Sequence, residues 1–147
     1  MQTVLTIASL VIATSVAFIG FQQYRLASAK FKLELFDRRY AIYKATQKYL
    51  SIILQKAHVE YSESITFLSE TQDAFFLFGP EVAEYLEALY KRGIDLCSTA
   101  HQFEPLPVGP ERSRMVEKNA ELLKALTDEL AHLKKVFEPH LSFNNWS

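Results

Sequence analysis

The first 24 residues of the chain carry no charged side chain, and 14 of the first 21 residues are apolar. As an α-helix, the 19 residues from Thr3 to Phe21 would extend over roughly 28 Å, close to the hydrocarbon thickness of a bilayer, about 30 Å. Threonine and serine are tolerated in such a helix because their hydroxyls can donate to carbonyls of the preceding turn. We therefore predict a transmembrane helix over residues 1–22.

Two other interpretations of this segment are a cleaved signal peptide and a buried helix of a soluble domain. A signal peptide normally begins with basic residues, which this segment lacks, and the small-residue sequence Ala27-Ser28-Ala29 lies well past the apolar run. Basic residues follow the span directly, at Arg25, Lys30 and Lys32, and none precedes it. Because basic flanks stay in the cytoplasm, we expect the amino terminus outside, residues 23–147 inside, and these three residues on membrane lipid.

Small residues recur along one face of the predicted span. Ser9, Ala13 and Ala17 are spaced by four residues, and Gly20 lies on nearly the same face. Such rows allow two helices to approach closely. The face is a candidate for self-association, although small residues are also common in spans that do not associate.

The rest of the chain has the periodicity of helices. We predict helices over about 22–58, 62–76, 80–101 and 111–137, with a proline-rich linker at 104–110. The fold class is therefore all-α: a transmembrane helix (1–22), a cytoplasmic antiparallel bundle of about four helices (23–138) and a carboxyl-terminal tail (139–147).

Three details of these helices follow from the spacing of their residues. We expect the second helix to turn Ile65, Leu68, Gln72 and Phe75 or Phe76 inward. We expect Gly79-Pro80 to form a corner and Pro139 to end the last helix. That last helix has the heptad pattern of a coiled coil, and the positions concerned are Val116, Asn119, Leu123, Leu126, Leu130, Leu133 and Phe137.

Charge is unevenly distributed along the predicted bundle. Residues 22–58 contain eight basic and two acidic residues, whereas residues 59–90 contain seven acidic and no basic residues. Mutual neutralisation of neighbouring helices is one interpretation, and contact of the basic residues with anionic lipid is the other. The net charge of −1 argues against binding to duplex nucleic acid.

Arg39 lies in line with Ile42 and Tyr49 on an apolar stripe. A buried arginine needs a partner, because an unpaired buried charge is very costly. We expect that partner to be acidic, and the candidates are Asp73, Glu81, Glu84 and Glu87. The arginine is then either structural, paired or snorkelling, or it contacts an anionic ligand.

No pattern of residues in the chain points to catalysis or to a cofactor. There is no nucleophile motif, no glycine-rich phosphate loop and no metal-ligand spacing among His58, His101, His132 and His140. The single cysteine, Cys97, lies on an apolar helical stripe and is interpreted as a small core residue. We therefore expect a protein without enzymatic activity, cofactor or metal.

Three segments of the sequence resemble those of a family of small, uncharacterised bacterial membrane proteins with a single span. They are KLELFDRRYAIY at 32–43, FFLFGPEV at 75–82 followed by Tyr85-Leu86, and FEPHL at 137–141. The resemblance covers about residues 30–141. It implies a helical fold and a bacterial inner-membrane location, and it implies no activity.

Two functions are compatible with these observations. The first is a membrane-anchored interaction module, accessory subunit or scaffold that binds a protein partner or a second copy of itself. The second is a membrane-tethered sensor that binds a small anionic ligand, such as a nucleotide, and acts by oligomerising. Its ligand residues would be Arg38, Arg39, Lys44 and Lys48.

Overall fold

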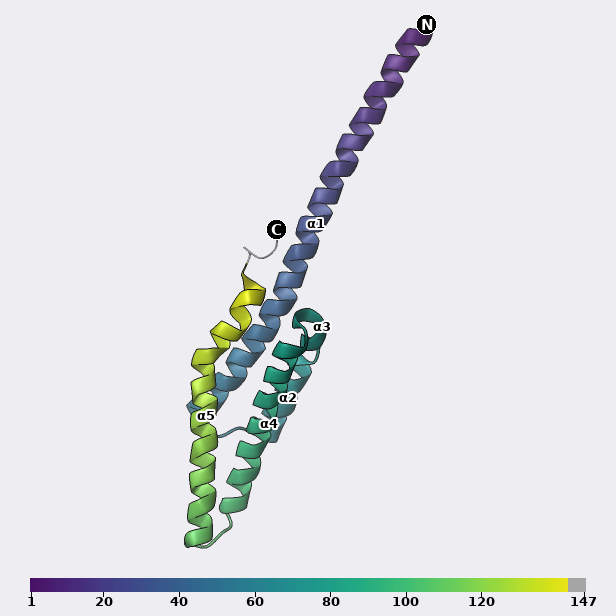
Figure 1. Ribbon diagram of the computed structural model, residues 1–147. Helices are drawn as coiled ribbons and strands as arrows, with labels where there is room; N and C mark the ends of the chain where they lie inside the picture. The colour runs from purple at the N-terminus through teal and green to yellow at the C-terminus, as the bar shows by residue number, and fades with distance from the viewer. Residues whose placement is uncertain (143–147) are drawn as a thin grey trace. The chain divides into compact units, whose positions relative to one another are not determined.

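The computed structural model describes residues 1–142, without the side chains of residues 4, 5, 8, 9 and 11. Five helices occupy the described residues, and no strand occurs among them. The predicted all-α class is thus confirmed. In chain order the helices are α1 (Gln2–Lys56), α2 (Tyr61–Thr71), α3 (Ala74–Phe78), α4 (Pro80–Phe103) and α5 (Pro110–Leu141) (Figure 1).

The chain divides into two compact units, Met1–Phe36 and Asp37–Ser147. The first unit is the amino-terminal part of α1, and its large apolar side chains from Ile7 to Phe21 are more than half exposed. Its threonine hydroxyls bond within the helix as expected, since Thr6 and Thr14 donate to the carbonyls of Gln2 and Leu10.

A membrane-spanning helix was predicted for residues 1–22. In the part of the chain that the structure describes, no helix is both long and apolar enough to cross a membrane. The predicted span is therefore not supported by the described residues. Ser9 of the predicted self-association face has its side chain outside this description.

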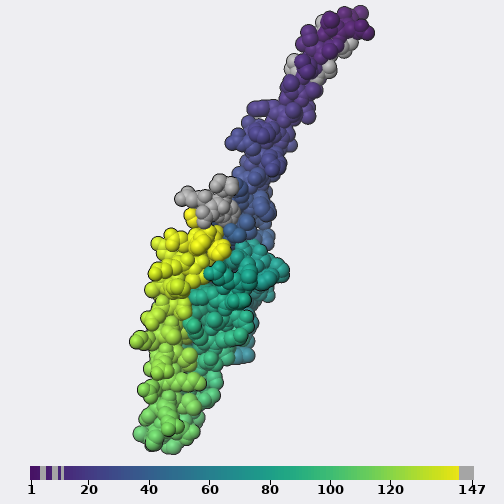
Figure 2. All heavy atoms as spheres, viewed as in Figure 1, coloured from purple at the N-terminus to yellow at the C-terminus, as the bar shows by residue number. Residues whose placement is uncertain are grey.

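The second unit is an antiparallel bundle. The part of α1 after residue 36 runs against α2, and α4 and α5 run in opposite directions, with the short α3 at the corner between α2 and α4 (Figure 1). Figure 2 shows α4 and α5 lying side by side along one face of this unit. The core is built from apolar residues of all four long helices, among them Leu50, Ile53, Phe67, Leu89, Leu96, Leu126, Leu133 and Phe137.

Gly93 of α4 lets the Tyr49 side chain of α1 lie directly on the helix. A Cβ atom at this glycine would come within 1.7 Å of the Tyr49 hydroxyl oxygen. That hydroxyl is hydrogen-bonded to Ser64 Oγ of α2 at 2.9 Å, and the Tyr49 ring stacks on Phe67 at 4.3 Å. Burial raises the pKa of Tyr49 despite the bond to Ser64, so the phenol stays neutral and joins three helices.

The face that α2 buries differs from the prediction. Ser64, Phe67 and Thr71 face the core, whereas Ile65 and Leu68 are 46% and 44% exposed. The contacts of Tyr49 with Ser64 and Phe67 explain the difference, because they turn this side of the helix toward α1. The expectation for Ile65 and Leu68 was therefore wrong.

The predicted second helix is also divided into two. It stops at Thr71, whose hydroxyl donates back to the Phe67 carbonyl, and α3 begins after Asp73. The corner at Gly79-Pro80 is confirmed: Gly79 has φ +93°, a conformation that favours glycine, and Pro80 opens α4.

Helix α5 continues through Pro139 to Leu141, so the expected stop at this proline was wrong. A proline so near a carboxyl-terminal end removes one hydrogen bond from a turn that is about to finish, and the Ser142 amide still donates to Glu138. Leu141 packs against the core, and residues 143–147 of the predicted tail lie outside the described residues.

Candidate functional site

Arg39 lies where three segments of the bundle meet. Its Nε donates a hydrogen bond to the Leu77 carbonyl oxygen at 2.8 Å, and its Nη1 donates to the His140 carbonyl oxygen at 3.2 Å. Leu77 and His140 each stand one residue before the end of a helix, α3 and α5. Such carbonyls lack partners within their helix and lie at its negative end. One guanidinium thus caps two helices.

Aromatic rings surround this arginine. Its Cζ lies 5.7 Å from the centroid of the Phe78 ring, a cation–π contact. Phe78 in turn meets Phe137 and His140 edge to face, at 5.2 and 5.4 Å. Tyr43 covers the other side of Phe137 at 5.5 Å. We call these residues and Arg39 the Arg39 cluster; burial lowers the pKa of its guanidinium.

We predicted an acidic partner for Arg39, either Asp73, which directly precedes α3, or a glutamate of α4. The two hydrogen bonds given above have backbone carbonyls as their acceptors, and the acidic partner stays a prediction. A spacing argument compares side chains along the sequence and does not show where helix ends converge in space. These two bonds give Arg39 a structural role in the bundle, which is one of the alternatives that the sequence left open.

His140 provides a pH test of this cluster. Burial and the positive charge of Arg39 lower the pKa of its imidazole, against a smaller opposing effect of Glu81. The unfolded chain therefore binds a proton at higher pH than the folded chain. The stability that this neutral imidazole contributes to the folded chain is therefore fully present above the ordinary histidine pKa, about 6.5. It is lost progressively as the pH falls below that value.

We expect the melting temperature of the wild-type chain to decrease between about pH 7 and pH 5, and the decrease to be smaller in His140→Gln. Circular dichroism melts at matched ionic strength measure this. His132→Gln is the control, since His132 is exposed. Equal pH slopes for wild type and His140→Gln would contradict the assignment.

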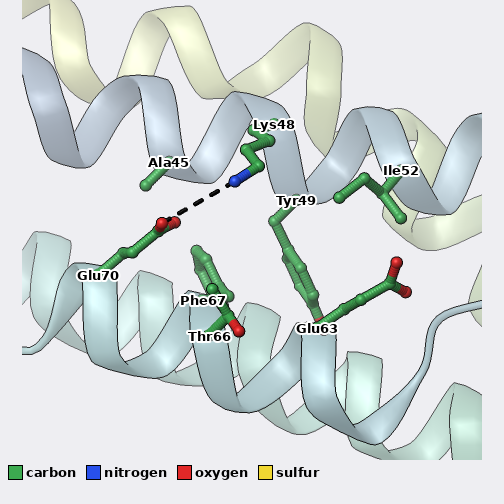
Figure 3. Close-up of a pocket in the computed structure, with 8 residues that line it drawn as sticks. All are labelled: Ala45, Lys48, Tyr49, Ile52, Glu63, Thr66, Phe67 and Glu70. Atoms are coloured by element: carbon green, nitrogen blue, oxygen red, sulfur yellow. Dashed lines mark ion pairs between the residues drawn. The ribbon is translucent and has the colours of Figure 1, made fainter.

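A pocket of about 210 Å³ lies between α1 and α2 (Figure 3). Lys48 and Tyr49 line it from α1, and Glu63, Phe67 and Glu70 line it from α2. Lys48 Nζ lies 3.9 Å from Glu70 Oε1. With two carboxylates and one ammonium, the lining does not favour an anion such as a nucleotide.

The four predicted ligand residues are not brought to one place. Lys44 and Lys48 line one hollow along α1 together with Glu70, and Lys44 donates to Gln47 Oε1 at 3.0 Å. Arg39 is nine residues from Lys48, two and a half turns, and so lies on the opposite side of the helix. Arg38 is exposed. An anion site that uses all four is therefore not formed.

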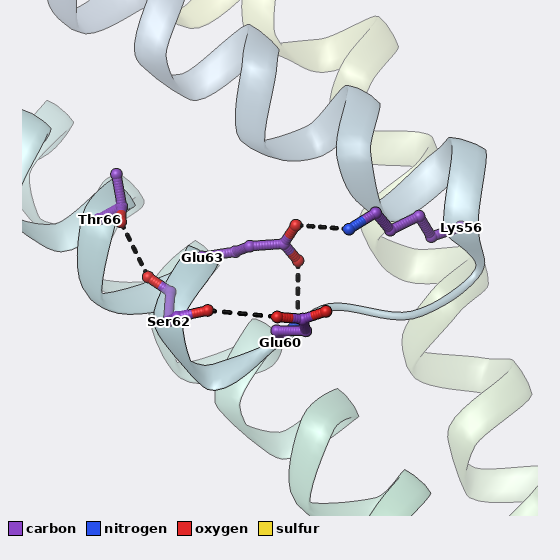
Figure 4. A network of polar contacts seen from close by, with 5 residues as sticks. All are labelled: Lys56, Glu60, Ser62, Glu63 and Thr66. Atoms are coloured by element: carbon purple, nitrogen blue, oxygen red, sulfur yellow. Dashed lines mark hydrogen bonds and ion pairs between the residues drawn. The ribbon is translucent and has the colours of Figure 1, made fainter.

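The start of α2 contains a polar network with a structural role (Figure 4). Glu63 accepts from Lys56 Nζ at 2.7 Å and from the Glu60 amide at 2.9 Å, which completes a capping box. Burial acts to raise the pKa of Glu63, but these two hydrogen bonds and the charges of Lys56 and His58 together outweigh it and lower the pKa. The same hydrogen bond to Glu63 stabilises the charged form of Lys56 and therefore raises the pKa of Lys56.

A cysteine–histidine contact on α4 was missed by the sequence analysis. His101 Nδ1 lies 2.8 Å from the Cys97 carbonyl oxygen and 3.7 Å from its Sγ. The spacing of four residues on a helix would have indicated it. His58 approaches the same imidazole, with 6.4 Å between ring centroids. Within the described residues, no three His, Cys, Asp or Glu side chains are placed to hold a metal ion.

The remaining candidate residues belong to the first unit. Arg25, Lys30 and Lys32 are exposed there, as are Ala13, Ala17 and Gly20. A Cβ atom at Gly20 would meet no other atom within 4 Å.

No family model matches the chain, and no curated protein or solved structure matches it. Residues of the segments 32–43, 75–82 and 137–141, which were singled out above by their sequence, share a location. Segment 32–43 contains Arg39, segment 75–82 contains Leu77 and Phe78, and segment 137–141 contains Phe137 and His140. They meet in the Arg39 cluster.

Proposed function

We propose that this protein is a membrane-anchored helical scaffold. Residues 1–22 hold it in the inner membrane, with the amino terminus outside, and the cytoplasmic bundle binds protein without catalysing a reaction. The chain is thereby proposed to share the architecture of the bacterial family that it resembles.

The observation that carries the anchor is the row of apolar side chains in the first unit. Ile7, Leu10, Ile12, Val16 and Phe18 are 63–65% exposed. Water is an unfavourable surrounding for exposed apolar side chains, whereas hydrocarbon is a favourable one. The hydroxyls of Thr6 and Thr14, bonded inside the helix, need no water. Four of the five residues whose side chains are not described are apolar as well.

The observation that favours protein binding over catalysis is that the charged side chains join helices to one another. Arg39 caps two helices, Lys56 supports the cap of α2, and Arg92 of α4 pairs with Glu129 of α5 at 2.6 Å. These groups hold the bundle together, and they do not converge on a cavity in the way that catalytic groups do.

Membrane retention tests the anchor. The full chain should stay in the membrane pellet after carbonate extraction, and the double variant Ile12→Arg/Val16→Arg should be released, because each central charge costs about 2.5–3.5 kcal/mol on insertion. Tyr24→Arg, beyond the proposed span, is the control and should be retained. Release of the wild-type chain by carbonate would refute the anchor.

Orientation is tested with single cysteines in a Cys97→Ser background. Thr3→Cys should react with a membrane-impermeant maleimide on intact cells. Gln55→Cys, an exposed position of the bundle, should react only after lysis. The reverse pattern would place the bundle outside.

A further inference from the structure

A row of large apolar side chains follows the outer side of α2 and continues onto α3. Tyr61, Ile65 and Leu68 are 58%, 46% and 44% exposed, and Phe75 and Phe76 are 57% and 85% exposed. The spacing of three or four residues puts the first three on one side of α2, beside the face that buries Ser64, Phe67 and Thr71. We call these five exposed residues the outer stripe; contiguous apolar surface of this kind marks an interaction site.

The charge around the outer stripe restricts what can cover it. Residues 59–90 contain seven acidic and no basic residues. Glu63 and Glu70 face lysines of α1, whereas Glu60 and Asp73 are exposed at the two ends of α2. Anionic lipid would be repelled by this surface, and a symmetric contact would set acidic residues against one another. The occupant is therefore expected to be both apolar and basic.

The same chain contains such a segment. Between residues 24 and 33, Tyr24, Leu26, Phe31 and Leu33 are 56–73% exposed. Three basic residues alternate with them, and no acidic residue occurs in this range. Tyr24 and Phe31 are seven residues apart, so they share one side of α1. We call residues 24–33 the basic segment.

We propose that the outer stripe of one copy binds the basic segment of a second copy. The proposal rests on the function proposed above and names the partner of the bundle. A helix laid along another helix would bury both apolar rows and bring basic residues to the acidic ends of α2. Because two different surfaces meet, the contact is either made reciprocally within a closed two-fold pair or made head to tail, which links copies into rings or open chains.

Directed cross-linking in native membranes tests the contact. Two copies with different tags are co-expressed as full chains in a Cys97→Ser background, one with Phe31→Cys and the other with Phe76→Cys, and a short bis-maleimide is added. We expect a cross-linked species that contains both tags. Gln102→Cys, exposed on α4, replaces Phe76→Cys in the control and should give at least tenfold less product.

Two outcomes would overturn the proposal. One is a Phe31–Phe76 yield no higher than that of the control. The other is efficient linking between two Phe76→Cys copies without linking to Phe31→Cys, which would indicate a symmetric contact. A foreign basic partner would give the first outcome, together with additional mass in native mass spectra.

Surface variants provide a second readout. Ile65→Ser/Leu68→Ser removes part of the outer stripe at exposed positions, so the helical content should be unchanged and the cross-link should fall at least tenfold. An unchanged yield would also overturn the proposal. Carbonate retention is measured on the same samples: retention without the cross-link refutes the docking alone, whereas loss of retention refutes the membrane anchor.

Discussion

Replacing Arg39 with alanine is expected to cause the largest loss of stability in the bundle. The variant loses two charged hydrogen bonds, each contributing about 1.5–3 kcal/mol, and leaves the carbonyls of Leu77 and His140 without that donor. The cation–π contact with Phe78 adds to the loss. We expect a decrease of about 3–5 kcal/mol, or roughly 15–25 °C in melting temperature.

Circular dichroism melts of the full chain in mild detergent measure this loss. Arg38→Ala is the matched control, because the neighbouring side chain is exposed and should change stability by less than about 0.5 kcal/mol. Arg39→Lys should be intermediate, since an ammonium lacks the planar fork that reaches two carbonyls. An Arg39→Ala variant that melts like wild type but loses its function would instead make this arginine a ligand residue.

Replacing Gly93 with alanine is expected to have the second-largest effect. The added methyl group would lie 1.7 Å from the Tyr49 hydroxyl oxygen and 2.9 Å from Cζ, and Tyr49 is held by Ser64 and Phe67. Overpacking of this kind costs about 3 kcal/mol, and the better helix propensity of alanine offsets roughly 1 kcal/mol. We therefore expect a net loss of about 2 kcal/mol.

Two variants distinguish overpacking from other causes. Gly20→Ala introduces the same methyl group where no atom lies within 4 Å, and it should leave the melting temperature of the bundle unchanged. Tyr49→Phe removes the atom nearest to the added methyl, so Gly93→Ala should cost less in that background than in the wild type. Equal costs in both backgrounds would show that Tyr49 is not the obstacle.

The sequence predicts the helices of this fold better than it predicts their orientation. Gly79-Pro80 identifies a corner because only certain residues suit that backbone. The buried side of α2 is different. Its apolar residues Ile65 and Leu68 follow a helical period, yet the hydroxyl of Tyr49 and the ring of Phe67 decide which side faces α1. Helical periodicity shows which residues share one side of a helix. It does not show which neighbouring helix that side packs against.

The candidate site shows the same limit. The position of Arg39 on an apolar stripe correctly identifies it as a residue that needs partners. Two of these partners are the backbone carbonyls of Leu77 and His140, and every residue type has a carbonyl. Composition and spacing therefore contain no sign of them, and they become visible only where α3 and α5 end beside α1.

The two carbonyl partners of Arg39 are synthesised at different times. They lie 38 and 101 residues after it in the chain, and ribosomes add about 5–20 residues per second. The α3 cap can thus form seconds after Arg39 is made, whereas the α5 cap must wait roughly 5–20 seconds. During that interval α1 and α4 lack the contacts that they make with α5. The nascent bundle is then an open form, and the docking of α5 closes it.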